Sequence, residues 1–153
     1  MTDPLGPSRR MTAVERAIAL RDVEAFRSVP MEQLAHVAAV SREERFAEGA
    51  VFFREGDPPG GLLVVLEGAV RLERGGKVLG EAVAGETLGA WSLFDEHRRR
   101  ATAMAARDTR VLILEREAFY EVLSEHVEIV KSMFRDLVHR LLALAGPADE
   151  ETR

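Results

Sequence analysis

The spacing of hydrophobic residues first indicates helix. From Met11 to Val40, apolar side chains recur at intervals of three and four, which is the helical period. Thr12 is placed to cap a first helix, and Pro30 lies at an early position of a second helix. We therefore expect two short helices before residue 41. Residues 1–10 contain two prolines and no apolar period, which predicts a flexible tail.

The middle of the chain changes to short runs of β-forming residues separated by glycines. The candidate strands are residues 44–47, 51–53, 62–66, 69–74, 77–84, 101–105 and 110–115. Gly75 and Gly76 separate two alternating runs and predict a two-residue hairpin turn, because glycine tolerates the positive φ that such turns need. No helix-length segment separates these strands, so the pattern favours an antiparallel roll, barrel or sandwich over a parallel doubly wound sheet.

Helical periodicity returns after Arg116 and persists to about Ala145. Apolar residues step by three and four along one face of this region, with a second apolar face beside it. The first face forms a seam of Val127, Val130, Phe134, Leu137, Leu141 and Leu144. We predict that one face packs on the β-roll and that the seam (Val127 to Leu141) forms a homodimer or binds another protein. The alternative is that both faces pack within one chain. Gly146 and Pro147 end the helix, and residues 147–153 form a polar tail.

Composition bounds the class of protein. The 153 residues, 46% of them hydrophobic, suit one domain, which we place at residues 11–146 with the β-roll at about 43–115 and C-terminal helices at 117–145. The net charge of −5 disfavours nucleic-acid binding. The absence of cysteine excludes disulfides and thiol chemistry, and no run approaches the length of a membrane span. We expect a cytoplasmic protein that binds neither DNA nor a membrane.

Catalytic and metal-binding motifs are missing from the sequence. His36, His97, His126 and His139 are scattered, with no pair at the spacing that places two ligands on one helix face. No nucleophile elbow, phosphate-binding loop or dinucleotide fingerprint occurs. The sequence therefore predicts a protein that is not an enzyme and has no metal or cofactor.

A series of glycine and apolar landmarks follows a recognisable order. The landmarks are Phe46, Gly49, Phe52, Gly56, Val65, Gly68, Gly85, Gly89 and Phe119. The series resembles the cyclic nucleotide-binding domain of the bacterial catabolite activator, protein kinase A regulatory subunits and cyclic-nucleotide-gated channels, over residues 31–142. The resemblance implies an α+β fold: an antiparallel, jelly-roll-like β-roll with N-terminal helices, a short phosphate-cassette helix and a long C-terminal helix.

The resemblance also implies a ligand site. In the family, N–H groups at the start of a short helix bind the cyclic phosphate, and a buried arginine pairs with it. These features map to a short helix at residues 90–94 and to Arg99. The implied ligand-binding residues are Gly89, Ala90, Trp91, Arg99, Arg100 and Ala101. Strand alternation would turn Arg99 into the pocket and Arg100 to the opposite face, although Arg100 replaces a usually small residue and could crowd the phosphate or add a charge.

Ala90 and Trp91 bear on how a nucleotide would bind at this site. Ala90 stands where the family has a glutamate that binds the ribose hydroxyl, and losing such a bond costs about 1.5–3 kcal/mol. Trp91 has two interpretations: it packs into the core, which we favour, or it stacks on a base.

Two functions remain open. In one, the domain is a sensor that binds an anionic nucleotide, cyclic AMP or cyclic GMP, and shifts its C-terminal helix. In the other, the pocket has decayed, and the domain is a nucleotide-independent interaction or dimerisation module. Family members related to the catabolite activator carry a DNA-binding module after the long helix. This chain ends about where that module would begin, so we expect no transcription-factor activity of this polypeptide unless it is a fragment.

Overall fold

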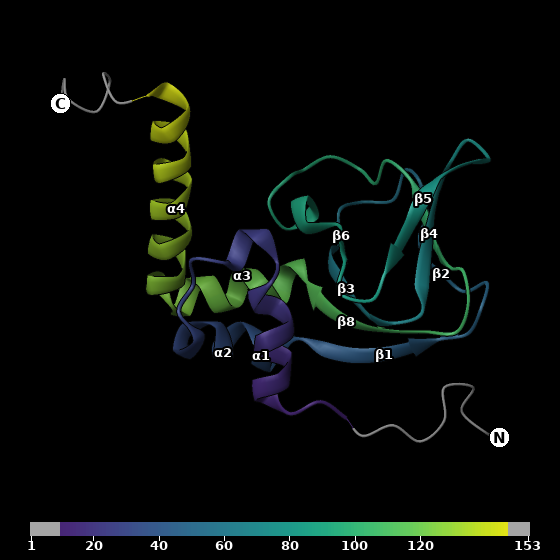
Figure 1. Ribbon diagram of the computed structural model, residues 1–153, viewed down its shortest axis with the longest axis horizontal. Coiled ribbons are helices and arrows are strands. Elements are labelled where there is room, and N and C mark those ends of the chain that lie inside the picture. Colours follow the sequence, from purple (N-terminus) through teal and green to yellow (C-terminus); the bar gives the residue numbers. More distant parts are fainter. Residues whose placement is uncertain (1–9, 147–153) are drawn as a thin grey trace.

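Two antiparallel sheets and a group of helices form the computed structural model, which describes residues 10–146 (Figure 1). The predicted tails lie outside these residues, apart from Arg10. One sheet has the strand order β1-β8-β3-β6 and the other β2-β7-β4-β5. The strands are β1 (Arg42–Phe46), β2 (Val51–Phe53), β3 (Gly61–Glu67), β4 (Ala69–Arg74), β5 (Lys77–Val83), β6 (Thr87–Leu88), β7 (Thr102–Ala105) and β8 (Thr109–Glu115). The predicted α+β class and antiparallel roll are confirmed.

Helices flank the roll at both ends of the chain, and one short helix lies within the roll between β6 and β7. They are α1 (Ala13–Arg21), the 3-10 helix η1 (Glu24–Phe26), α2 (Met31–Val40), the 3-10 helix η2 (Ala90–Leu93), α3 (Arg116–Glu125) and α4 (Val127–Ala145). Thr12 caps α1 as predicted, because its side chain accepts a hydrogen bond from the Glu15 N–H while the Glu15 carboxylate accepts one from the Thr12 N–H.

Alternation along the central strands of the first sheet creates two separate cores. Leu62 and Leu114 point toward the helices and pack in one buried cluster with residues such as Phe119. Leu63 and Val111 point to the other face and pack in a second cluster, between the two sheets. These strands are therefore covered on both faces, which explains their nearly continuous apolar sequence.

The β4–β5 hairpin has the predicted turn. Arg74 pairs with Lys77 across Gly75 and Gly76, whose φ values are +56° and +79°. Strand β6 was not predicted, because two residues are too few to show an alternating pattern.

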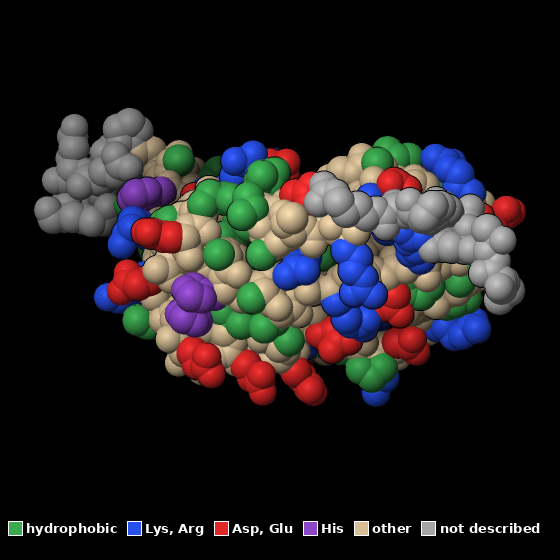
Figure 2. Space-filling model, turned by 90° about the horizontal axis from the view of Figure 1, so that it is seen from below, with side chains coloured by type: hydrophobic (Ala, Val, Ile, Leu, Met, Phe, Trp, Pro, Cys, Tyr) green, Lys and Arg blue, Asp and Glu red, His purple; other side chains and the backbone are tan. Residues whose placement is uncertain are grey.

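Ion pairs cover the outer side of β1. The Arg110 guanidinium, from β8, bonds the carboxylates of Glu43 and Glu67 at 2.8 and 2.9 Å. Figure 2 shows Lys and Arg side chains lying among Asp and Glu side chains on the face seen from below. Opposite charges are thus interspersed there.

The C-terminal helical region contains a break that the sequence did not reveal. His126 has φ −132° and ψ 76° and separates α3 from α4. Its ring stacks on that of His36 with centroids 3.7 Å apart. Helix α4 then stands apart from both sheets (Figure 1), so the prediction that one of its faces packs on the β-roll is wrong. Ile129 is its one buried residue.

Candidate functional site

A cavity of about 320 Å³ lies where η2 meets the segment before β7. Its apolar lining comes from β2, β4 and β6, and its polar lining from η2 and the following loop. The lining residues are Phe53, Leu72, Leu88, Gly89, Trp91, Ser92, Asp95, His97, Arg98, Arg99, Arg100 and Ala101. The cavity therefore contains five of the six predicted ligand-binding residues. We call it the arginine cavity.

Gly89 makes the turn that starts η2. Its φ of +76° is left-handed, and a Cβ atom there would lie 2.5 Å from Nη1 of Arg99 and 2.6 Å from the Gly61 carbonyl oxygen. Both distances are shorter than real Cβ contacts, so only glycine allows η2 and the arginine to approach this closely.

Arg99 is partly buried between η2 and β3. Its Nη1 donates to the Ser92 hydroxyl at 2.8 Å, and its Nη2 donates to the Gly61 carbonyl at 3.2 Å. The guanidinium also lies 4.0 Å from the centroid of the Phe53 ring. Burial lowers the pKa of Arg99 from its usual value, and the charge of Asp57 opposes that shift. The buried Nε has no hydrogen-bond partner in the structure. The groups that hydrogen-bond the Arg99 guanidinium are therefore neutral.

The backbone around Arg99 is fixed by the turn after β2. The Arg99 N–H donates to the Asp57 carbonyl at 2.7 Å, and the Arg99 carbonyl accepts from the Gly56 N–H at 2.8 Å. The Arg98 side chain donates to the Gly56 carbonyl at 2.9 Å. The arginine segment therefore pairs with residues 56–57, and this pairing sets the direction of the Arg99 side chain.

Arg100 and Ala101 also line the arginine cavity. The Arg100 side chain is exposed, and its carbonyl accepts from Nε of Arg74 at 2.7 Å. We expected Arg100 on the opposite face, but it belongs to the rim of the same cavity. Strand β7 begins only at Thr102, so strict strand alternation does not apply to Arg100.

Ala90 and Trp91 differ from the expectations. The predicted short helix exists, but it is a 3-10 helix with three residues per turn, so Ala90 and Leu93 share its inner side. Trp91 is 76% exposed, so the favoured core position was wrong. Ala90 does not line the arginine cavity. It lines a neighbouring cavity of about 250 Å³ instead.

That neighbouring cavity connects η2 with α4. Gly89 and Trp91 line both cavities, and Arg140 of α4 lines the neighbouring one. The Arg140 guanidinium bonds the carboxylate of Glu24, in η1, at 2.9 Å. This interface cavity therefore places the wall of the arginine cavity next to the C-terminal helix.

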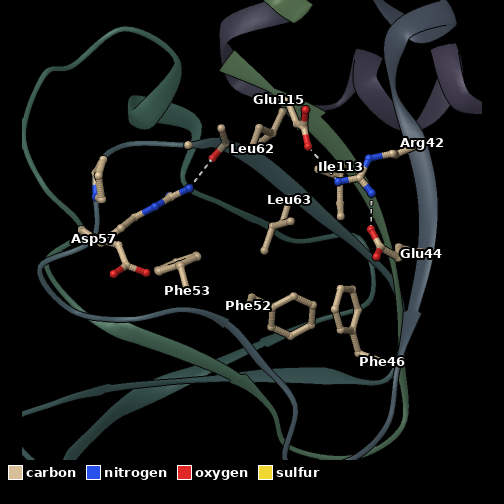
Figure 3. A pocket seen from close by; sticks show the side chains of 14 residues that line it. Arg42, Glu44, Phe46, Phe52, Phe53, Asp57, Leu62, Leu63, Ile113 and Glu115 are labelled. Atoms are coloured by element: carbon tan, nitrogen blue, oxygen red, sulfur yellow. Dashed lines mark hydrogen bonds and ion pairs between the residues drawn. The ribbon is translucent and has the colours of Figure 1, made fainter. Parts of the chain in front are cut away.

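A third cavity, of about 380 Å³, lies on the other side of Arg99 (Figure 3). Phe46, Phe52, Leu63 and Ile113 face its interior, while Arg42 bonds Glu44 and Glu115 at one end. The hydrogen bond to Glu115 is the largest cause of the raised pKa of Arg42. Sequence reasoning did not anticipate this cavity, because it forms only when the two sheets meet.

Ser92, Gly61 and Phe53 are site residues that the sequence analysis missed. Each contacts Arg99 but comes from a different element, and only the position of Ser92 three residues after Gly89 offered a signal. Over residues 10–146, no three His, Cys, Asp or Glu side chains are grouped so as to hold a metal ion. Nor is any helix in that range long and apolar enough to cross a membrane.

The fold and the arginine cavity define a class of protein: a β-roll with a short helix and an arginine facing each other across a pocket. The family model of the cyclic nucleotide-binding domain matches residues 43–126. The chain belongs to this family.

Solved structures and curated sequences agree with this assignment. The N-terminal domain of a transcriptional regulator from Streptomyces coelicolor is 31% identical, with a TM-score of 0.71 over 80% of this chain and 90% of that chain. The regulatory domain of Toxoplasma gondii PKA, crystallised with cAMP, is 25% identical, with a TM-score of 0.63 over 81% of this chain and 49% of that chain.

Among curated proteins, the cGMP-dependent protein kinase egl-4 of Caenorhabditis elegans is 28% identical over 144 residues. That match covers 87% of this chain and 18% of the kinase. Lysophospholipase nte1 of Aspergillus fumigatus is 34% identical over 110 residues, covering 64% of this chain and 7% of that protein. The chain thus spans less than a fifth of these longer relatives.

Proposed function

We propose that this domain is a regulatory, non-catalytic sensor that binds cyclic AMP or cyclic GMP in the arginine cavity. The observation that carries the proposal is the state of Arg99. Its guanidinium borders a cavity and touches only neutral acceptors and an aromatic ring. No ion pair between described residues involves it. A cyclic phosphate would supply the missing negative charge through two parallel hydrogen bonds.

The rest of the ligand has a matching environment. Leu72 and Leu88 offer an apolar wall for the sugar and base, and the exposed Trp91 ring stands at the cavity for stacking. Ala90 provides no carboxylate for a ribose hydroxyl. We therefore expect weaker binding than a site with such a carboxylate would give.

Contacts between η2 and α3 provide a route from the ligand to the C-terminal helices. Arg116 donates to the Ser92 carbonyl at 2.8 Å, and the Tyr120 hydroxyl donates to the Leu93 carbonyl. Both donors belong to α3, so a phosphate that displaces Ser92 and shifts η2 also pulls on α3. Movement of α4 follows, because only the single residue His126 separates it from α3.

Calorimetric titration with cyclic AMP and cyclic GMP tests this function. Arg99→Ala should weaken binding by about one to two orders of magnitude, since it removes a charge-assisted contact. Arg99→Lys keeps the charge but loses the planar fork, so it should fall between wild type and Arg99→Ala. Arg107→Ala, an exposed arginine at the far end of β7, is the matched control. Absence of heat at millimolar nucleotide, with a folded protein by circular dichroism, would overturn the proposal.

The alternative function is a nucleotide-independent interaction module. Two observations favour it: Nη1 and Nη2 of Arg99 already donate to Ser92 and Gly61, and one face of α4 has no partner within the described chain. In this case Arg99 is a structural link between η2 and β3. Arg99→Ala would then lower the free energy of unfolding, and neither the wild type nor the variant would bind a nucleotide.

Under either function, we propose that α4 pairs with α4 of a second copy. The seam residues are all exposed: Val127 57%, Val130 38%, Phe134 65%, Leu137 51%, Leu141 57% and Leu144 85%. A heptad seam is self-complementary under two-fold symmetry, so one surface serves both partners. The alternative that both faces pack within one chain does not describe this structure.

A further inference from the structure

Positive charge is concentrated around the arginine cavity. Its lining contains Arg98, Arg99 and Arg100 but only one carboxylate, that of Asp95. The chain as a whole has a net charge of −5, so this excess is local. No ion pair among residues 10–146 joins any of the three arginines to a carboxylate.

The one carboxylate is already engaged. Asp95 accepts a hydrogen bond from the backbone N–H of His97 at 2.9 Å and contacts the His97 ring. The bond from the His97 backbone is the largest cause of the lowered pKa of Asp95, and Arg100 adds a small effect at longer range. Asp95 therefore stays ionised. Together with Asp57, whose charge acts on Arg99, it supplies two negative charges against the three arginines of the lining.

At the rim, the side chain of Arg98 and the backbone of Arg100 are held in place. Arg98 is tied to the Gly56 carbonyl, and the backbone of Arg100 is tied to Arg74. The Arg74 side chain thereby places a fourth cation beside the backbone of Arg100. Like charges held together in this way repel one another, and an anion at the rim relieves that repulsion.

We propose that the preferred ligand of the arginine cavity is a nucleotide with two phosphoryl groups rather than a cyclic mononucleotide, an inference that rests on the proposed function of this same site. One phosphate pairs with Arg99 inside the cavity. The second lies at the rim against Arg100, with Arg98 and Arg74 nearby. A cyclic mononucleotide carries a single negative charge, which Arg99 alone matches.

The shape of the cavity agrees with this assignment. Its volume of about 320 Å³ is at the lower end for small-molecule sites, so it encloses part of a nucleotide and leaves the rest at the mouth. The exposed Arg100 is at that mouth. Ala90, which faces the neighbouring cavity, brings no carboxylate that would repel a second phosphate.

Competition calorimetry with three adenine nucleotides tests the inference: cyclic AMP, adenosine 3′,5′-bisphosphate and ADP. Adenosine 3′,5′-bisphosphate carries two separated phosphates, and ADP carries two adjacent ones, so the two compounds test both spacings. We expect at least one to bind about tenfold or more tightly than cyclic AMP, with an affinity that falls more steeply as salt is raised. Arg100→Ala should remove this advantage, because it should weaken binding of the nucleotide with two phosphoryl groups by a larger factor than binding of cyclic AMP. Arg107→Ala is again the control and should change neither affinity.

The outcomes separate the two proposals. If cyclic AMP binds through Arg99 but both bisphosphorylated nucleotides bind equally or more weakly, the inference is wrong and the sensor function stands. The inference is also wrong if Arg100→Ala reduces all three affinities by the same factor. If none of the three binds to folded protein, both proposals fail.

Discussion

Gly89 and Arg99 form a pair in which each residue depends on the other. The glycine turns η2 away at the point where the guanidinium passes, and the guanidinium bonds Ser92 one turn later. A side chain at position 89 would overlap the guanidinium and the Gly61 carbonyl, so the observed position of Arg99 requires glycine there.

Gly89→Ala should destabilise the domain through two effects that a matched variant separates. Gly76 has φ +79°, close to the +76° of Gly89, but has open space around it. Gly76→Ala should therefore cost about 1–2 kcal/mol of unfolding free energy from backbone strain alone. Gly89→Ala should exceed this by about 1–3 kcal/mol, because its Cβ also meets Arg99 and Gly61. Urea denaturation of both variants measures the difference, and equal losses would show that no clash occurs at Gly89.

Trp91 should report directly on the arginine cavity. It is the only tryptophan in the chain and is 76% exposed. Its fluorescence should be red-shifted and readily quenched by acrylamide, because solvent reaches the indole. Nucleotide in the cavity should reduce that quenching in wild type but not in Arg99→Ala. Blue-shifted, poorly quenched emission from the free protein would contradict the exposed placement.

Sequence reasoning succeeded at residues whose roles depend on local backbone. The Gly75–Gly76 turn and the Thr12 cap follow from φ preferences and from one hydrogen-bond pattern. It failed at Trp91, because Ala90 and Leu93 form the buried side of η2 and leave the indole exposed. Arg100 was misplaced because residues just before a strand need not alternate.

At the scale of elements, α4 differs from all the other helices in its packing. It contributes one buried residue, Ile129, over nineteen residues, whereas α2 buries three over ten. A hydrogen bond from the Ser28 hydroxyl to the Ser132 carbonyl and the Arg140–Glu24 pair hold it to the body. Its stability in solution therefore depends on what covers its seam.

Phe134→Asp should convert the protein from dimer to monomer. The substitution places a charge in the centre of the seam, where the other copy would bury it. Val14→Asp is the control, because Val14 has the same exposed fraction, 65%, but lies on α1. Sedimentation equilibrium of both variants gives the answer. A wild type that is monomeric at high concentration, unchanged by Phe134→Asp, would refute pairing through α4.

The break between α3 and α4 could not be located from the spacing of apolar residues. Apolar spacing is helical on both sides of His126, so the sequence offers no stop signal there. In the folded chain, His126 lies at the break and stacks against His36, which is about ninety residues away in sequence. A contact of this kind is visible only after folding.

At the scale of the whole molecule, the arginine cavity lies close to α4, the helix with the fewest buried residues for its length. The arginine cavity and the interface cavity share Gly89 and Trp91, and the latter cavity also reaches Arg140. Seven of the eight strands and their antiparallel arrangement could be predicted from glycine spacing and alternation. The full lining of the three cavities could not, because each is lined by residues from several elements whose relative positions the sequence does not specify.

Arg140→Ala should loosen α4 without unfolding the roll. An exposed ion pair contributes about 0.2–1 kcal/mol, so amide exchange in residues 134–145 should accelerate by roughly 1.4- to 5-fold. The measurement is hydrogen exchange by mass spectrometry in a Phe134→Asp background, so that dimerisation does not mask the effect. Lys131→Ala is the control, since Lys131 pairs only with Glu128 of its own helix. Unchanged exchange would mean that Arg140 does not restrain α4.

The pairing of β1 with β8 has a consequence for how the chain acquires its structure. Arg42 lies opposite Ile113, so the first strand of the roll is completed only by the last. Such distant pairings close large loops and slow the search for the native state, typically to milliseconds or longer. During synthesis, β1 emerges from the ribosome before β8, so its backbone stays unpaired until β8 has also emerged. Its four successive charged residues, Arg-Glu-Glu-Arg at 42–45, suit that interval, because charged edges discourage pairing with other nascent chains.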